Sequence, residues 1–234
     1  MLTENDGVRV MAVNRSAWMA DAELITDTSI ARWAQDRQSG DLRRADFQVP
    51  SGFDRYCRVF HRVQGETEDL PWSHFADKAG VAMHQRIKWP DIDSRLDGPK
   101  EGSPQDGTMD DASFLRFLRV IRERSGSNSE LRAGFWDGIY NFAILDAPTA
   151  TLGLREHVLF TVGLDALIAA VDSSVAQAPG VLWPADRSWY MSTDIDYNST
   201  IISGSSGLIE ALIADRLLEV IEISPDLDLT RPAR

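Results

Sequence analysis

The sequence predicts an α+β fold, in which helices pack against a largely antiparallel sheet, and three observations support this class. Apolar and polar residues alternate along segments 53–63, 81–89 and 188–196, and this period of two is typical of strands with one face in water. Helical periodicity occurs between these segments without the regular β–α–β rhythm of a parallel sheet. Turn residues at 196–199 separate two strand-like runs, which is typical of an antiparallel hairpin.

The C-terminal forty residues give the clearest pattern. We expect a strand at 188–196 that returns, after the turn, along 200–203. Trp189 would lie on the apolar face of the first strand, and Asp194 and Asp196 on the face exposed to water.

A helix and a last strand complete this region. Ser205 or Ser206 can cap the helix, because a serine oxygen accepts hydrogen bonds from the free amides of the first turn. The run at 218–223 predicts the final strand, and Pro225 ends it. The apolar stripe of the expected helix consists of Leu208, Ile209, Leu212 and Ile213.

The N-terminal part predicts a strand, a helix and a second strand. Segment 8–13 is rich in β-branched residues, as strands are. Ser29 can cap a helix that ends near Gly40. The turn at 50–52 then leads into the strand at 53–63.

In the middle of the chain, proline and glycine residues mark where the expected elements begin and end. Pro71 is tolerated in the first turn of a helix and Gly80 is a typical C-cap, so a helix is expected between them. Alternation then predicts a strand at 81–89. Segment 94–108, with three glycines and two prolines, is expected to be a long flexible loop.

Asp110 or Asp111 is expected to cap the strongest helix of the chain, which has arginines on its outer face. Segment 133–145 predicts a strand pair or a bent strand that turns at the step Asp137-Gly138. The apolar stripe of the helix consists of Phe114, Phe117, Leu118 and Ile121.

The remaining elements are short. We expect a strand at 157–162, a helix at 164–171 and a loop at 177–185. The organisation predicted for the whole chain is a single domain, 1–224, followed by a frayed tail, 225–234.

Composition limits the functional classes. The chain has 234 residues and a net charge of −12, which argues against nucleic acid or an anionic membrane as partner. Cys57 is the only cysteine, so the chain can form neither an internal disulfide nor a cysteine metal cage. No signal peptide and no apolar run of membrane-spanning length is recognised, so we expect a cytoplasmic protein.

Asp194 and Asp196 invite comparison with aspartate-based phosphate hydrolases, in which such a pair holds a nucleophile, an acid and magnesium. Asn198 stands where that family expects a small hydroxyl or β-branched residue, and too little chain follows to supply the other motifs. The alternative is that both carboxylates are simply solvated beside a turn. They are retained as catalytic candidates of low rank.

Cys57 and His61 fail as a nucleophile and base. Four residues along one strand span about 13 Å, whereas the pair needs about 3 Å. Cys57 is expected to be a buried apolar residue and His61 a hydrogen-bonded core histidine. The four histidines show no zinc spacing, so no metal and no cofactor is expected.

Two short runs are candidate binding surfaces. The first, Trp183, Asp186, Arg187 and Trp189, combines aromatic and charged residues, which dominate binding energetics, although both tryptophans can equally fill the core. The second offers free amides and hydroxyls at a helix N-terminus, which suits an anion, but it lacks the lysine and the length of a P-loop. The residues of the second run are Gly204, Ser205, Ser206 and Gly207.

Segments 50–53, 58–61, 135–138 and 183–189 together resemble a group of uncharacterised bacterial proteins. The resemblance covers the chain from about 49 to 223. It implies one recurring domain and carries no activity, because none is assigned to that group.

The preferred functional expectation is a cytoplasmic protein that acts by binding, with another protein as partner and without catalysis. An immunity- or antitoxin-like role suits an acidic chain that is poor in motifs. The alternative is a hydrolase-like enzyme for a phosphorylated or other anionic small molecule, and a scaffold without any site is a third reading. The enzyme requires Asp194 and Asp196 in a concave pocket with the helix N-terminus pointing in, whereas the binder requires a flat face with exposed tryptophan edges.

Overall fold

The computed structural model describes residues 22–65, 68–98, 102–126, 129–140, 147–173 and 177–230. Within them lies one nine-stranded sheet of order β1-β5-β3-β6-β7-β8-β2-β9, with β4 also paired to β5. Each of its strand pairs is antiparallel. The predicted α+β class with a largely antiparallel sheet is therefore confirmed. The strands are β1 Ala22–Leu24, β2 Arg55–Phe60, β3 Glu130–Trp136, β4 Thr149–Leu152, β5 Arg155–Gly163, β6 Val181–Pro184, β7 Trp189–Ser192, β8 Ser199–Gly204 and β9 Val220–Ile223.

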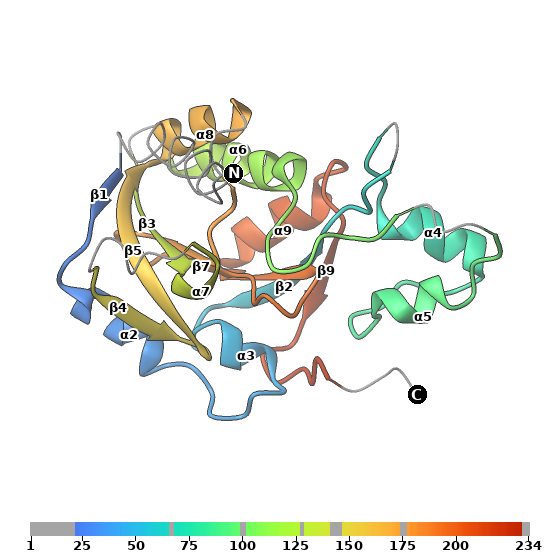
Figure 1. Ribbon diagram of the computed structural model, residues 1–234, viewed down its shortest axis with the longest axis horizontal. Helices are drawn as coiled ribbons and strands as arrows, with labels where there is room; N and C mark the ends of the chain where they lie inside the picture. Colours follow the sequence, from blue (N-terminus) through green and yellow to red (C-terminus); the bar gives the residue numbers. More distant parts are fainter. Residues whose placement is uncertain are drawn as a thin grey trace, which may run out of the picture.

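Helices cover both faces of the sheet (Figure 1). The group α6, α8 and α9 packs on one face, and α2 and α3 lie on the other. A third group, α4 and α5, forms a small lobe beside β2 with its own core cluster. The helices are η2 Thr28–Ala31, α2 Arg32–Gln35, α3 Ala45–Gln48, α4 Trp72–Ala79, α5 Trp89–Asp93, α6 Asp111–Ser125, α7 Asp137–Tyr140, α8 Leu164–Asp172 and α9 Ser206–Ala214.

The predicted C-terminal ribbon and helix are present. β7 pairs with β8, and β8 continues into α9, where the hydroxyl of Ser205 accepts from the amide of Leu208. The exposed face predicted for β7 is wrong, however. Trp189 and Met191 pack under the α6 side while Tyr190 packs under the α3 side, so both faces of the strand are buried. The second layer comes from distant chain, which local alternation cannot reveal.

Several caps follow the predicted chemistry. Asp110 accepts from the amide of Ser113 at the start of α6, and Gly80 ends α4 with a φ of 63°. The cap near residue 29 differs, because Asp27 is the acceptor and Ser29 supplies the amide. The predicted strand 8–13 lies outside the described residues.

Two predicted elements are wrong. Segment 81–89 is irregular and leads into α5 at Trp89, because Ile87 and Trp89 anchor it to the small lobe rather than to the sheet. The loop predicted at 177–185 contains β6, whose four residues are all buried. An apolar run between two sheet neighbours forms a central strand even where no alternation marks it.

Two further segments differ in detail. β3 runs into the short helix α7 at Asp137 instead of turning there, and the rest of the predicted segment, 141–145, lies outside the described residues. An unpredicted strand, β4, forms a hairpin with β5. The described parts of 94–108 hold no helix or strand, apart from a bridge between Val63 and Pro104.

The predicted frayed tail is wrong for residues 225–230, which dock on α3. The amide of Ala45 donates to the carbonyl of Leu227, and the amide of Leu229 donates to that of Arg43. Leu227 and Leu229 are both buried in this contact. In the part of the chain that the structure describes, no helix has the length and apolarity needed to traverse a membrane.

Candidate functional site

The two tryptophans of the expected binding surface are buried. Trp183 is 1% exposed and Trp189 is 3% exposed, and they pack on opposite faces of the sheet. The exposed tryptophan edges expected of a binding face are therefore absent, because the two helical layers cover both rings. Only the turn between β6 and β7 remains at the surface, where Asp186 accepts from the amide of Ser188 and Arg187 lies over Trp33 at 5.3 Å.

The expected anion site and the expected carboxylates lie apart. Asp194 and Asp196 precede β8, whereas the Gly/Ser run 204–207 follows it, and a six-residue strand spans about 17 Å. The helix terminus is also occupied by the protein itself, since the amide of Ser206 donates to the carboxylate of Asp54. The shared pocket expected of the enzyme is not found among the described residues.

Arg155, at the start of β5, holds the two carboxylates instead. Its guanidinium lies 2.8 Å from Asp196 and 3.5 Å from Asp194. The same group lies over the ring of Trp136, 5.3 Å from its centroid. The sequence analysis missed this arginine, because the partners are separated by about forty residues and meet only through the sheet.

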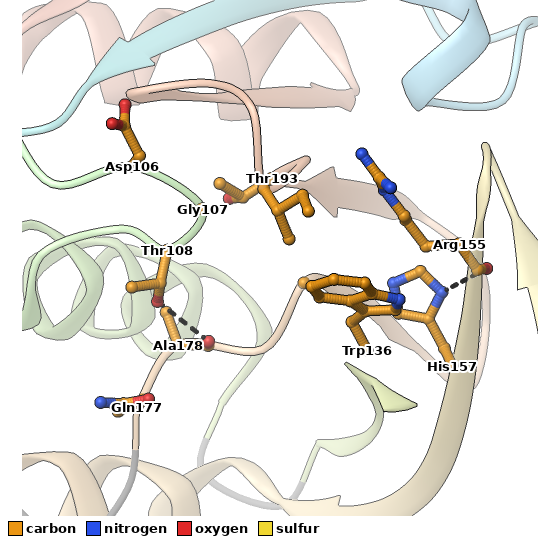
Figure 2. Close-up of a pocket in the computed structure, with 11 residues that line it drawn as sticks. Asp106, Gly107, Thr108, Trp136, Arg155, His157, Gln177, Ala178 and Thr193 are labelled. Atoms are coloured by element: carbon orange, nitrogen blue, oxygen red, sulfur yellow. Dashed lines mark hydrogen bonds between the residues drawn. The ribbon is translucent and has the colours of Figure 1, made fainter. Parts of the chain in front are cut away.

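A pocket of about 60 Å³ lies beside Arg155, at the end of the sheet where β3 and β7 end and β5 and β6 begin. The loop 106–108 closes its other side. In Figure 2, Asp106 and Thr108 lie on one side, Trp136, Arg155 and His157 on the other, and Thr193 between them. Its lining consists of Asp106, Gly107, Thr108, Trp136, Arg155, His157, Gln177, Ala178, Gly180, Thr193 and Ile195.

His157 is buried and neutral in this pocket. Burial is the main reason that its pKa falls to about 4, from an ordinary value of 6.5. Its Nδ1 lies 2.9 Å from the carbonyl of Arg155, which can only accept, so Nδ1 carries the proton. Among the described residues no hydrogen bond to Nε2 is found, so its lone pair can accept from another molecule.

His61 is the hydrogen-bonded core histidine that was expected. Its Nδ1 lies 2.7 Å from the carbonyl of Gln105, and its Nε2 lies 2.9 Å from the hydroxyl of Thr200. Burial lowers the pKa of this imidazole to about 4 as well. Cys57 is fully buried and its pKa is raised by that burial, so it is an apolar core residue and no nucleophile.

A second concavity, which we name the leucine groove, opens on the other side of Asp194 and Asp196. It holds about 280 Å³ and is lined by Leu42, Phe47, Gln48, Lys88, Leu154, Asp194, Asp196, Tyr197, Leu229 and Thr230. Leu42 is 53% exposed and Leu154 is 57% exposed, and both lie in this one concavity. Gln48 is buried, and its Oε1 has no hydrogen-bond partner among the described residues.

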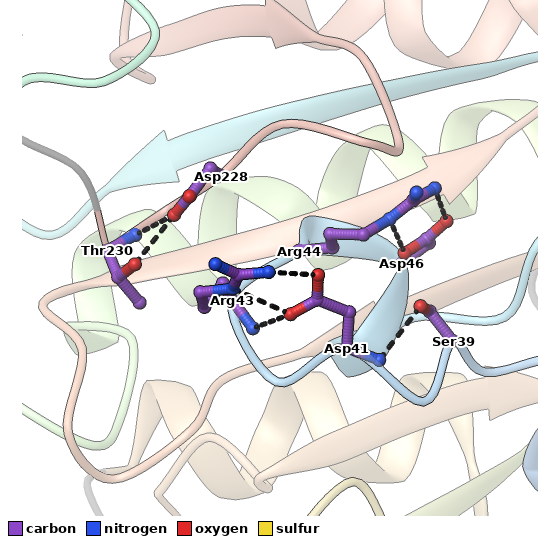
Figure 3. A network of polar contacts seen from close by, with 7 residues as sticks. All are labelled: Ser39, Asp41, Arg43, Arg44, Asp46, Asp228 and Thr230. Atoms are coloured by element: carbon purple, nitrogen blue, oxygen red, sulfur yellow. Dashed lines mark hydrogen bonds and ion pairs between the residues drawn. The ribbon is translucent and has the colours of Figure 1, made fainter.

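Ion pairs fix the wall of the leucine groove around α3 (Figure 3). Arg43 forms two hydrogen bonds to Asp41, and Arg44 forms two to Asp46. The docked tail supplies the neighbouring Thr230, whose carbonyl accepts from Lys88 at 2.6 Å. The groove is therefore built from five segments that are far apart in sequence.

Among the described residues, no group of three or more histidine, cysteine, aspartate or glutamate side chains is placed to hold a metal ion. Comparison with known proteins finds no family model, no curated protein and no solved structure that matches this chain. The resemblance to uncharacterised bacterial proteins therefore stays a prediction.

Proposed function

We propose that this protein acts by binding a partner protein, and that an extended segment of the partner lies in the leucine groove. The observation that carries the proposal is that Leu42 and Leu154, two strongly exposed apolar side chains, line the same concavity. Exposed apolar side chains that gather in one concave place mark interaction sites, whereas scattered ones do not.

The polar groups of the leucine groove suit a polypeptide. Asp196, with its side chain 72% exposed, can face a basic side chain. One segment of a polypeptide can bring an apolar side chain to Leu42 and Leu154 and a basic side chain to Asp196.

The matched variants are Leu154→Asp, Leu42→Asp and Leu217→Asp. Leu217 is 59% exposed but lies outside the leucine groove, so it controls for the general effect of a surface charge. In capture from cells that make the protein naturally, we expect one protein band to be lost with the first two variants and kept with the third. Loss of a contact at the centre of an interface lowers affinity about tenfold or more.

The place where the partner binds is checked with a photoreactive amino acid that replaces Leu154 or Leu217. The proposal requires that the same band crosslinks from position 154 and not from 217. Equal capture by all three aspartate variants, or crosslinking from 217 alone, would contradict it. Identification of the band as a toxin would support the immunity- or antitoxin-like form of this function.

A further inference from the structure

The pocket beside Arg155 presents hydrogen-bond acceptors whose own protons point elsewhere. His157 holds its proton on Nδ1, bonded to the carbonyl of Arg155, so its Nε2 offers a lone pair. Gly180 leaves the space in front of that nitrogen open, since a Cβ at this position would lie 3.2 Å from Nε2. The same wall therefore has an acceptor and, in front of it, room for a donor.

Thr193 is a second acceptor, and a chain of hydrogen bonds fixes its direction. His61 must carry its proton on Nδ1, because it bonds the carbonyl of Gln105. Its Nε2 then accepts from the hydroxyl of Thr200, whose oxygen is left to accept from Thr193 at 2.6 Å. The hydroxyl proton of Thr193 is thus committed to Thr200, and its buried oxygen has only lone pairs left for the pocket.

Arg155 bounds the same wall but offers the ligand no contact through these nitrogens. Its Nη2 is held by Asp194 and Asp196. Its Nε has no hydrogen-bond partner among the described residues and is enclosed by protein atoms, out of reach of a ligand. The contacts on which the pocket relies are therefore the two acceptors.

We infer that this pocket binds a small primary carboxamide. The two amide N–H groups of the ligand donate to Nε2 of His157 and Oγ1 of Thr193. A volume of about 60 Å³ exceeds several times the roughly 10–15 Å³ needed by one water, so a molecule of a few heavy atoms fits. The ring of Trp136 supplies a flat apolar wall for the planar amide.

Other ligand classes match the lining less well. A carboxylate would bring lone pairs toward two acceptors that have no proton to give. A ketone has no proton to donate and would leave both His157 and Thr193 without a donor. A cation would lie next to the guanidinium of Arg155 in a largely buried site, where desolvation is expensive.

Acetamide is the probe, and acetone and acetate are the matched controls, because the three have similar size and shape. In nitrogen-detected NMR of histidine-labelled protein, acetamide titrated into the millimolar range should shift the Nε2 signal of His157 saturably. His61 is the internal control, because its Nε2 is already bonded to Thr200 and should not move. The His157 signal is assigned by its loss in His157→Gln.

Three variants locate the ligand. Gly180→Ala places a methyl group in front of Nε2 and should abolish the shift. Thr193→Val should weaken acetamide binding about tenfold, the equivalent of one lost hydrogen bond, whereas Thr193→Ser should retain it. An equal response to acetone or acetate, no response to acetamide, or an unchanged response in Gly180→Ala would each overturn the inference.

Discussion

Burial of His61 and His157 links single residues to the stability of the protein. Burial disfavours the charged form of each imidazole in the folded state, so its pKa is about 4. The same environment fixes which nitrogen carries the proton, and thereby what each residue can donate or accept. Burial and hydrogen-bond direction together define the chemistry of the pocket.

The lowered pKa values predict loss of stability in mild acid. In the unfolded chain both histidines titrate near 6.5, so between pH 6.5 and 4 the unfolded state binds more protons than the folded state. The free energy of unfolding should therefore fall by about 2 kcal/mol per histidine from pH 7 to pH 5. Urea unfolding at both pH values measures this fall.

Replacement of either histidine measures its contribution to the fall in the free energy of unfolding. His157→Gln and His61→Gln should each show a smaller fall than the unmodified protein, since glutamine does not titrate. The comparison between variants is needed because Asp111, whose pKa is raised mainly by burial, acts in the opposite direction. An identical dependence on pH in all three proteins would contradict the prediction.

At the scale of elements, the helices differ in whether a neighbouring or a distant residue caps their N-termini. Ser205 caps α9 from the adjacent residue, as the sequence suggested. The N-terminus of α4, in contrast, receives Glu219 from 147 residues away, whose carboxylate accepts from the amide of Trp72 at 2.6 Å. Both caps bond free amides at a helix N-terminus. Only the cap of α9 can be recognised from neighbouring residues in the sequence.

Ser205→Ala should therefore destabilise the protein by about 1 kcal/mol, the usual cost of losing an N-cap. Ser206→Ala is the control, because its hydroxyl makes no hydrogen bond among the described residues and alanine favours helix. Thermal or urea unfolding of the two variants measures their stabilities and shows which serine caps α9. A cost for Ser206→Ala as large as that for Ser205→Ala would contradict the assignment.

At the scale of the whole molecule, the C-terminal segment closes the layer that covers β7. Leu227 and Leu229 join the core cluster that contains Tyr190 and Trp183, and their carbonyl and amide groups pair with the chain around α3. The tail is therefore a structural part of the fold, and it also lines the leucine groove through Leu229.

Leu227→Ala and Leu229→Ala should each lower the free energy of unfolding by about 2–5 kcal/mol, as for other buried leucines. Leu217→Ala, at a site 59% exposed, should change it by less than about 0.5 kcal/mol. Denaturant unfolding gives these values. If the tail variants cost no more than the control, the segment would not be part of the core.

The sequence by itself determined those features that a short window contains. Alternation predicted β2 and β7, the turn after β7 predicted β8, and helical spacing predicted α6, α8 and α9. Cap chemistry placed Asp110, Gly80 and Ser205. It also predicted that His61 would be a bonded core residue, since strand geometry excluded its use with Cys57. Each of these features depends on residues only a few positions apart.

The tertiary structure decided what lies on either side of the sheet. It buried both faces of β7, made a strand of β6 and docked the tail, because the covering layers come from distant chain. It also brought Arg155 and His157 together with Thr193, and so created a pocket that no local pattern marks. Periodicity reports that a face is apolar or polar, but burial of a polar face depends on which other segment packs against it.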